Sequence, residues 1–269
     1  MSGMFLRALI AAVLLSAISP VAVTAVAQGS TQQQTMSLKA GDVIVQQDED
    51  GWATVKIIAV DDWPDGTRVA HCILYKSVPE RPELDQTPSL PKAIMHAPMA
   101  AGAFATGWQL LGNLPVVKGD QEGFIAYLKF NDFLRYLSVT GQTTEAVVGE
   151  ANRHYDKANA LADAGDNEGA IVEYRKAIDL IPQFYEAIDN MGYSYMDLDR
   201  YDVALGVFDD SLAIEPDGVT AFFSRGECLI HLGRLDEAEA VLKQARERYP
   251  EERDGLAEFA RQLKAARRQ

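Results

Sequence analysis

The chain has 269 residues, of which 48% are hydrophobic and 24% are charged, a composition suited to one or two globular domains. Its formal net charge is −14, with 39 Asp and Glu residues against 25 Lys and Arg residues. Nucleic acids and anionic membrane surfaces need a basic protein surface, so this excess of acid argues against both as partners.

The first 27 residues have the layout of a secretory signal peptide. Arg7 precedes an apolar run at 8–18, and an A-x-A cleavage site ends at Ala27. The alternative is an uncleaved membrane anchor, but Pro20 interrupts the apolar stretch. We expect cleavage after Ala27, a polar linker at 28–35, and no stable membrane insertion of the mature chain. Such a leader indicates an exported bacterial protein, periplasmic or secreted.

Residues 36–142 are expected to form a small α+β domain that begins with a β-meander. Residues 43–45, 52–60 and 67–78 are rich in β-forming residues, and the last run alternates, with Val69, His71, Ile73 and Tyr75 on one face. Acidic turns containing Gly51 and Gly66 separate the three runs. The pattern predicts three antiparallel strands.

A proline-rich connection follows the third predicted strand. Proline at this density disfavours both helix and central strand; the residues are Pro79, Pro82, Pro88, Pro91 and Pro98. Residues 104–111 are expected to return as a strand. Asp120 is the expected N-cap of a helix that runs to Lys129, and residues 133–137 suggest a further helical turn.

No catalytic, cofactor or metal motif stands out, so we expect no enzyme activity, no cofactor and no metal site. The acidic run at 48–51 is too short for a calcium-binding EF-hand, and no Cys or His spacing suggests zinc. Cys72 and Cys228 lie among apolar residues and are expected to be buried, although export would permit a disulfide. His71 and Cys72 are adjacent on a predicted strand and point to opposite faces, and His96 has no recognisable partner.

The second half of the chain repeats itself every 34 residues, the spacing of Pro182, Pro216 and Pro250. Aligned on these prolines, the repeats cover 151–184, 185–218 and 219–252. The eighth position of each repeat is small (Ala158, Gly192 and Gly226), and so is the twentieth (Ala170, Ala204 and Ala238). The eleventh position is large (Leu161, Tyr195 and Leu229). Small residues permit close approach of two helices, and proline ends the second helix of each unit.

This pattern resembles the tetratricopeptide-repeat (TPR) family over about 120 residues. The resemblance implies that residues 143–269 form an all-α solenoid of three repeats followed by a capping helix at 253–268. Thr143 or Thr144 is the expected N-cap of its first helix.

In this family the first helix of each repeat lines a concave groove that binds other proteins. Carried over to this sequence, the groove should expose Asn152, Tyr155, Asn159, Glu186, Asp189, Asn190, Tyr193, Asp197, Phe223, Glu227 and His231. Some members clamp a partner's C-terminal carboxylate. Asn159 and Asn190 match the asparagines of that clamp, but Tyr155, Thr220 and Ser224 stand where it needs cations, so no such clamp is expected here.

The resemblance implies a non-enzymatic scaffold that binds another protein, with a basic and apolar partner segment favoured by the acidic groove. Two alternatives remain open. One is an enzyme or small-ligand receptor whose site lies in the N-terminal domain, with His71, Cys72 and His96 as candidates and the repeats as a recruitment arm. The other is a self-associating structural protein, which would form a homo-oligomer.

Overall fold

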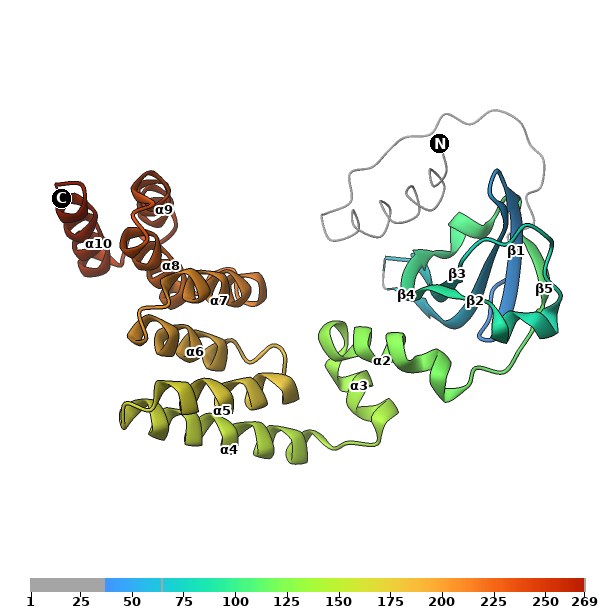
Figure 1. The fold of residues 1–269 in the computed structure, drawn as a ribbon, viewed down its shortest axis with the longest axis horizontal. Coiled ribbons are helices and arrows are strands. Elements are labelled where there is room, and N and C mark those ends of the chain that lie inside the picture. The colour runs from blue at the N-terminus through green and yellow to red at the C-terminus, as the bar shows by residue number, and fades with distance from the viewer. Residues whose placement is uncertain (1–36, 64, 269) are drawn as a thin grey trace. The chain divides into compact units, whose positions relative to one another are not determined.

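The computed structural model describes residues 37–63 and 65–268. The predicted signal peptide, its cleavage site and the polar linker lie outside these residues. None of the helices within the described ranges has both the length and the apolar character needed to cross a membrane. The chain divides into two compact units between Asp132 and Phe133, ten residues earlier than the boundary expected at 142 (Figure 1).

The first unit is built on a five-stranded antiparallel sheet with the order β4-β3-β2-β1-β5. The strands are β1 (Asp42–Asp48), β2 (Gly51–Asp62), β3 (Arg68–Tyr75), β4 (Lys92–Ala100) and β5 (Gln109–Asn113). Consecutive pairing of β1, β2 and β3 confirms the predicted meander. Gly51 starts β2 with a φ of 126°, a conformation that only glycine adopts easily.

The C-terminal end of the proline-rich connection forms strand β4, which was not predicted from the sequence. β4 lies at the edge of the sheet, where Pro98 is opposite His71 on β3. An edge strand tolerates proline because its outer N–H groups need no partner in the sheet. Earlier in the connection the chain forms a 3-10 helix, η1 (Leu84–Ser89). A second one, η2 (Ala101–Phe104), delays the start of β5 beyond the expected position.

Helix α2 (Lys118–Asn131) packs against β4 and β2. Gly123 permits this close contact, because a Cβ built there would lie 2.7 Å from the Met95 carbonyl oxygen. Asp120 was expected as the N-cap, but it lies in the first turn after the N-cap residue Val117. Its carboxylate accepts hydrogen bonds from the Val117 N–H at 3.2 Å and the Lys56 ammonium at 2.7 Å. The buried ion pair with Lys56 therefore joins α2 to the sheet.

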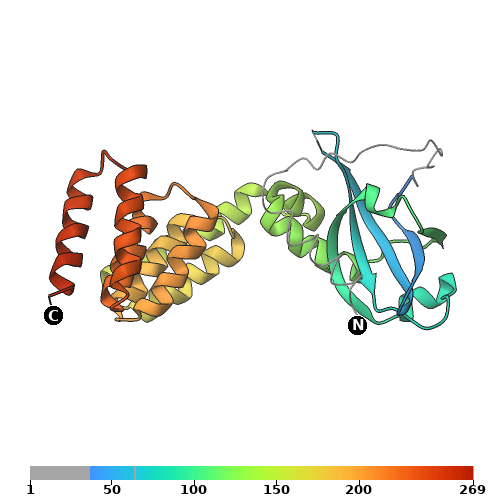
Figure 2. The same ribbon diagram turned by 90° about the horizontal axis from the view of Figure 1, so that it is seen from above.

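The second unit consists of helices, and those from residue 144 onward pack in succession, which confirms the predicted solenoid (Figure 2). They are α3 (Phe133–Thr140), α4 (Thr144–Asp163), α5 (Asn167–Leu180), α6 (Tyr185–Asp197), α7 (Tyr201–Ile214), α8 (Val219–His231), α9 (Leu235–Arg248) and α10 (Arg253–Ala266). Thr143 is the N-cap of α4, and its side chain accepts a hydrogen bond of 3.3 Å from the Ala146 N–H.

The small residues of the repeat lie where the helices approach most closely. Ala158, Ala170, Ala204 and Ala238 are fully buried. At Gly192 a Cβ would lie 2.7 Å from two ring carbons of Phe208 on α7. Any larger side chain at these positions would therefore separate the paired helices.

Candidate functional site

Helices α4, α6 and α8 are the first members of the three helix pairs, and the groove was expected along their adjacent faces. Helix α6 contacts α4 and α8, and α8 also contacts α10. Two pockets lie along this face and share Tyr193. We call them the polar pocket, between α4 and α6, and the acidic pocket, between α6, α8 and α10.

The polar pocket has a volume of about 430 Å³ and is organised by two asparagines. Asn159 Oδ1 accepts hydrogen bonds from the Tyr174 hydroxyl at 2.6 Å and from Asn190 Nδ2 at 3.0 Å. Asn190 Nδ2 also donates to the Tyr155 hydroxyl at 3.0 Å. Burial, with a contribution from Tyr155, raises the pKa of Tyr174 to about 12, so its hydroxyl stays a donor.

Carboxylates also face the polar pocket. Its lining consists of Asn159, Ala162, Asp163, Tyr174, Asn190, Tyr193, Ser194 and Asp197. None of these described lining residues is Lys or Arg, so the pocket offers no cation to a partner's carboxylate. The two asparagines serve the protein's own hydrogen-bond network and hold α4 against α6.

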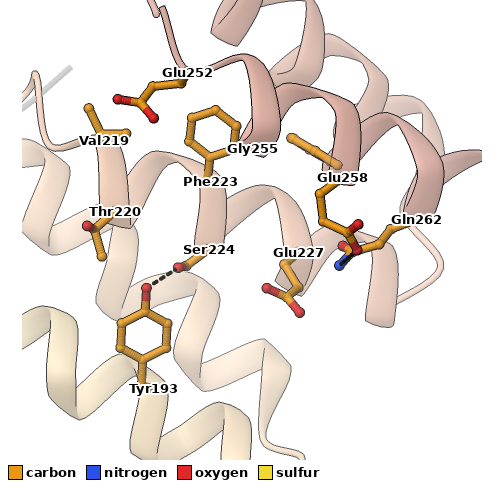
Figure 3. A pocket seen from close by; sticks show the side chains of 11 residues that line it. Tyr193, Val219, Thr220, Phe223, Ser224, Glu227, Glu252, Gly255, Glu258 and Gln262 are labelled. Atoms are coloured by element: carbon orange, nitrogen blue, oxygen red, sulfur yellow. Dashed lines mark hydrogen bonds between the residues drawn. The ribbon is translucent and has the colours of Figure 1, made fainter.

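The acidic pocket, about 330 Å³ in volume, places an aromatic ring among carboxylates (Figure 3). The Phe223 ring stands between Glu252 on one side and Glu227 and Glu258 on the other. Gly255 leaves room for this ring, because a Cβ there would lie 3.3 Å from Phe223 Cε1. The remaining lining residues are Tyr193, Val219, Thr220, Ser224, Phe259 and Gln262.

Neighbouring side chains fix part of the acidic pocket. Ser224 donates a hydrogen bond of 3.0 Å to the Tyr193 hydroxyl, joining α8 to α6. Glu258 pairs with Arg261, and it accepts a 3.0 Å hydrogen bond from Gln262. Glu227 lies 4.0 Å from His231 Nε2, the limit of an ion pair. Glu227 and Glu252 are therefore the carboxylates best able to meet a cation from outside.

The structure brings six of the eleven expected groove residues into these pockets. Asn159, Asn190, Tyr193 and Asp197 line the polar pocket, and Phe223 and Glu227 line the acidic one. Tyr155 reaches the same network through Asn190. Asn152 and Glu186 are exposed and line neither pocket, whereas His231 stacks on Tyr201 of α7 at a ring distance of 4.1 Å.

Asp189 differs from the expectation of an exposed groove residue, because only 7% of it is exposed. Its Oδ1 atom has no hydrogen-bond partner among the described residues. Burial raises the pKa of Asp189, a hydrogen bond with Ser211 lowers it in part, and the nearby charge of Glu186 raises it further. Asp189 is therefore a buried acid beneath the groove and cannot act as an exposed steering charge.

The contribution of α10 to the acidic pocket was missed in the sequence. Glu252, Gly255, Glu258, Phe259 and Gln262 come from this helix or its N-cap. The repeat period carried the signal, since one further step of 34 residues makes α10 another first helix. Because α10 was predicted only as a capping helix, its residues were not included among the expected groove residues.

The first unit brings together His71 and His96, the two histidines named as candidates for an enzyme or ligand site. His71 Nε2 lies 2.9 Å from Asp61 Oδ2, and His71 Nδ1 lies 3.0 Å from His96 Nε2. The expectation that His96 has no partner was therefore wrong. The rings of Phe124 and Tyr127 on α2 pack over the pair, with centroid distances of 4.7 Å to His71 and 4.6 Å to His96, respectively.

Burial and the neighbouring His71 lower the pKa of His96 to about 4, so this ring is neutral at pH 7. The third candidate, Cys72, lies in the apolar core on the opposite face, as predicted for the residue next to His71. Burial raises the pKa of its thiol, and neither Cys72 nor Cys228 forms a disulfide within the described chain. The described residues include no group of three or more His, Cys, Asp or Glu side chains suited to a metal ion.

Comparison with known proteins identifies the repeats. Models of the tetratricopeptide-repeat family match residues 151–184 and 190–253. No curated protein matches the chain.

Similar solved structures of low sequence identity include two TPR domains and a secretion chaperone. The first TPR of Spaghetti (RPAP3), bound to the HSP90 peptide SRMEEVD, is 23% identical, with a TM-score of 0.41, over 44% of this chain and 94% of that chain. The TPR domain of Arabidopsis OM64 is 20% identical, with a TM-score of 0.41, over 44% and 98%. The Yersinia enterocolitica type III secretion chaperone SycD, in complex with a peptide of the translocator YopD, is 22% identical, with a TM-score of 0.40, over 43% and 91%.

Proposed function

Because the second unit carries tetratricopeptide repeats, which are protein-interaction modules, we propose that this protein is a non-enzymatic scaffold that holds a segment of a partner protein in its groove. One observation carries this proposal: two pockets follow each other on one face and share Tyr193. A surface already formed needs little ordering when a partner binds, so less binding free energy is lost.

The acidic pocket suggests what the partner segment carries. A Lys or Arg side chain has an aliphatic stem that can lie on the Phe223 ring while its charge meets Glu227 or Glu252. The same carboxylates attract a cationic segment before contact, which raises its association rate. We therefore propose a partner segment with basic residues beside apolar ones.

We also propose that the protein acts after export, in the periplasm or outside the cell, because of the leader at 1–27. N-terminal sequencing of the protein from its own cells should give Gln28 as the first residue. A chain that starts at Met1 in the membrane fraction would contradict export with cleavage.

Site-specific photo-crosslinking in the source cells tests the groove directly. Benzoylphenylalanine at Thr220, which lines the acidic pocket, should give a defined adduct with a partner protein. The matched control carries the same crosslinker at Val172, which is 50% exposed on α5. The Thr220 adduct should disappear when Glu227→Gln is combined with Tyr193→Ala. An adduct that forms only from Val172, or that survives these groove substitutions, would refute the groove as the binding surface.

The Asp61–His71–His96 chain supports a second candidate function, a proton-transfer or small-ligand site in the first unit. In that case His96→Gln should abolish the cellular function while the Thr220 adduct remains. The third candidate, self-association, predicts a dimer or larger species in size-exclusion chromatography with light scattering.

A further inference from the structure

A third cavity, of about 620 Å³, lies between α9 and α10, which are neighbours in Figure 1. We call it the end crevice. Its lining residues are Glu239, Ala240, Leu242, Lys243 and Arg246 from α9, Ala260, Leu263 and Lys264 from α10, and Arg267 and Arg268 directly after α10. None of them lines the acidic pocket, so α10 presents two different faces to two different cavities.

The end crevice is basic in an acidic protein. Five of its lining residues are Lys or Arg and one is Glu, a local balance of +4, whereas the whole chain has a formal charge of −14. Arg267 pairs with Glu239 at 2.7 Å and with Asp236 at 2.8 Å. Of the ion pairs in the described part of the chain, only these involve a cation of the crevice. Lys243, Arg246, Lys264 and Arg268 thus remain available to an anionic partner.

The floor of the crevice is apolar, and its residues hold repeat positions at which a first helix packs against the second helix of its pair. In the second repeat, Gly192 on α6 contacts Phe208 of the following helix, α7. Two steps of 34 residues place Ala260 at the same repeat position on α10, with Leu263 where α6 has Tyr195. No further helix follows α10 within the described residues, and Ala260 and Leu263 instead line the open crevice. Within the described residues, α10 therefore has no helix in the position that α7 takes on α6.

We propose that the end crevice binds an acidic amphipathic helix of a partner protein. The apolar stripe of that helix would lie on Ala260 and on the aliphatic stems of Lys243 and Lys264, above the buried side chains of Leu242 and Leu263. Its flanking carboxylates would meet the charged ends of Lys243, Arg246 and Lys264. Charge complementarity selects this occupant over a basic helix. The proposal is independent of the groove, because the two surfaces share no residue.

One helix of the repeats has a sequence suitable for a probe peptide. Helix α7 has three Asp and neither Lys nor Arg over Tyr201–Ile214, and it packs on α6 in the way proposed here for α10. The probe is a fluorescein-labelled peptide of this sequence, with a hydrocarbon staple across its exposed face to hold the helix. In this peptide Leu replaces Phe208, the ring that packs on Gly192 of α6. The corresponding residue of α10 is Ala260, whose Cβ leaves less room for a large side chain. A control peptide has Lys at the three Asp positions.

Fluorescence anisotropy with the whole protein should show saturable binding of the acidic peptide. Combining Lys243→Glu with Arg246→Glu should weaken it by about tenfold or more, since each change replaces attraction by repulsion. The matched control combines Arg153→Glu with Arg253→Glu, which makes the same charge change at exposed helical positions outside the crevice and should alter affinity by less than about twofold. The Lys peptide should bind about tenfold more weakly than the acidic one.

Equal affinity of the wild type and the crevice variant would overturn the proposal, as would equal affinity of the two peptides or no saturable binding of the acidic one. Circular dichroism of the crevice variant checks that the fold is retained. Light scattering provides the last control: a dimer that dissociates on crevice charge reversal would assign the surface to a second copy and refute a partner helix.

Discussion

Replacing Gly192 by Ala tests the repeat register at its tightest point. The new Cβ would lie 2.7 Å from Cε1 and Cζ of Phe208 and 3.2 Å from Cδ1. Carbon atoms pack best at about 3.5–4.0 Å, so the ring must move by about 1 Å. Phe208 is 0% exposed, so its ring can move only by displacing buried neighbours. Overpacking of this kind costs about 1–3 kcal/mol of folding free energy.

Alanine also favours helix over glycine by about 1 kcal/mol, which offsets part of that cost. Gly206 on α7 separates the two effects, because it is exposed and a Cβ there meets no atom within 4 Å. Gly206→Ala should therefore stabilise the protein by about 1 kcal/mol. The difference between the two variants isolates the steric cost, and we expect it to be about 1–3 kcal/mol.

Urea denaturation followed by circular dichroism at 222 nm measures this difference, since most of the helical signal comes from the second unit. The denaturation midpoint should fall in the order Gly206→Ala, wild type, Gly192→Ala, with an unchanged slope. Equal midpoints for the two alanine variants would show that α6 and α7 do not approach at Gly192, and the packing of the repeats would have to be revised.

Three further predictions concern titratable groups. Hydrogen bonds from Lys157, Lys176 and His154 lower the pKa of Glu173 from 4.5 to about 2. Its stabilisation should therefore be full above pH 4.5 and decline towards pH 2, so Glu173→Gln should flatten the urea midpoint across this range. The lowered pKa of His96 should weaken the first unit as the pH falls from 6.5 to about 4, and His96→Gln should remove that dependence in near-ultraviolet circular dichroism. Burial raises the pKa of Asp189, so the carboxylate destabilises the fold as the pH rises through its titration. Asp189→Asn should therefore raise the urea midpoint at pH 7 more than at pH 3; a lower midpoint at pH 7 would contradict this account.

Periodic features of this protein could be predicted because each depends on neighbours along the chain. The 34-residue spacing of Pro182, Pro216 and Pro250, with small residues at fixed positions, was enough to predict the helix pairs. Runs of β-forming residues between glycine-containing turns likewise predicted three strands, and two-residue alternation predicted the opposite orientations of His71 and Cys72. Position within a repeat also placed Tyr193, Phe223 and Glu227 on one face.

Contacts between distant segments required the tertiary structure. His96 joins His71 only because β4 pairs with β3 at the edge of the sheet, a pairing that the density of prolines concealed. Asp189 has the repeat position of a groove residue, yet the packing of α6 beside α7 buries it. The basic end crevice depends in the same way on how α10 packs against α9. Helical and strand periodicity are local properties, whereas burial and charge clustering depend on which surfaces meet when those elements pack.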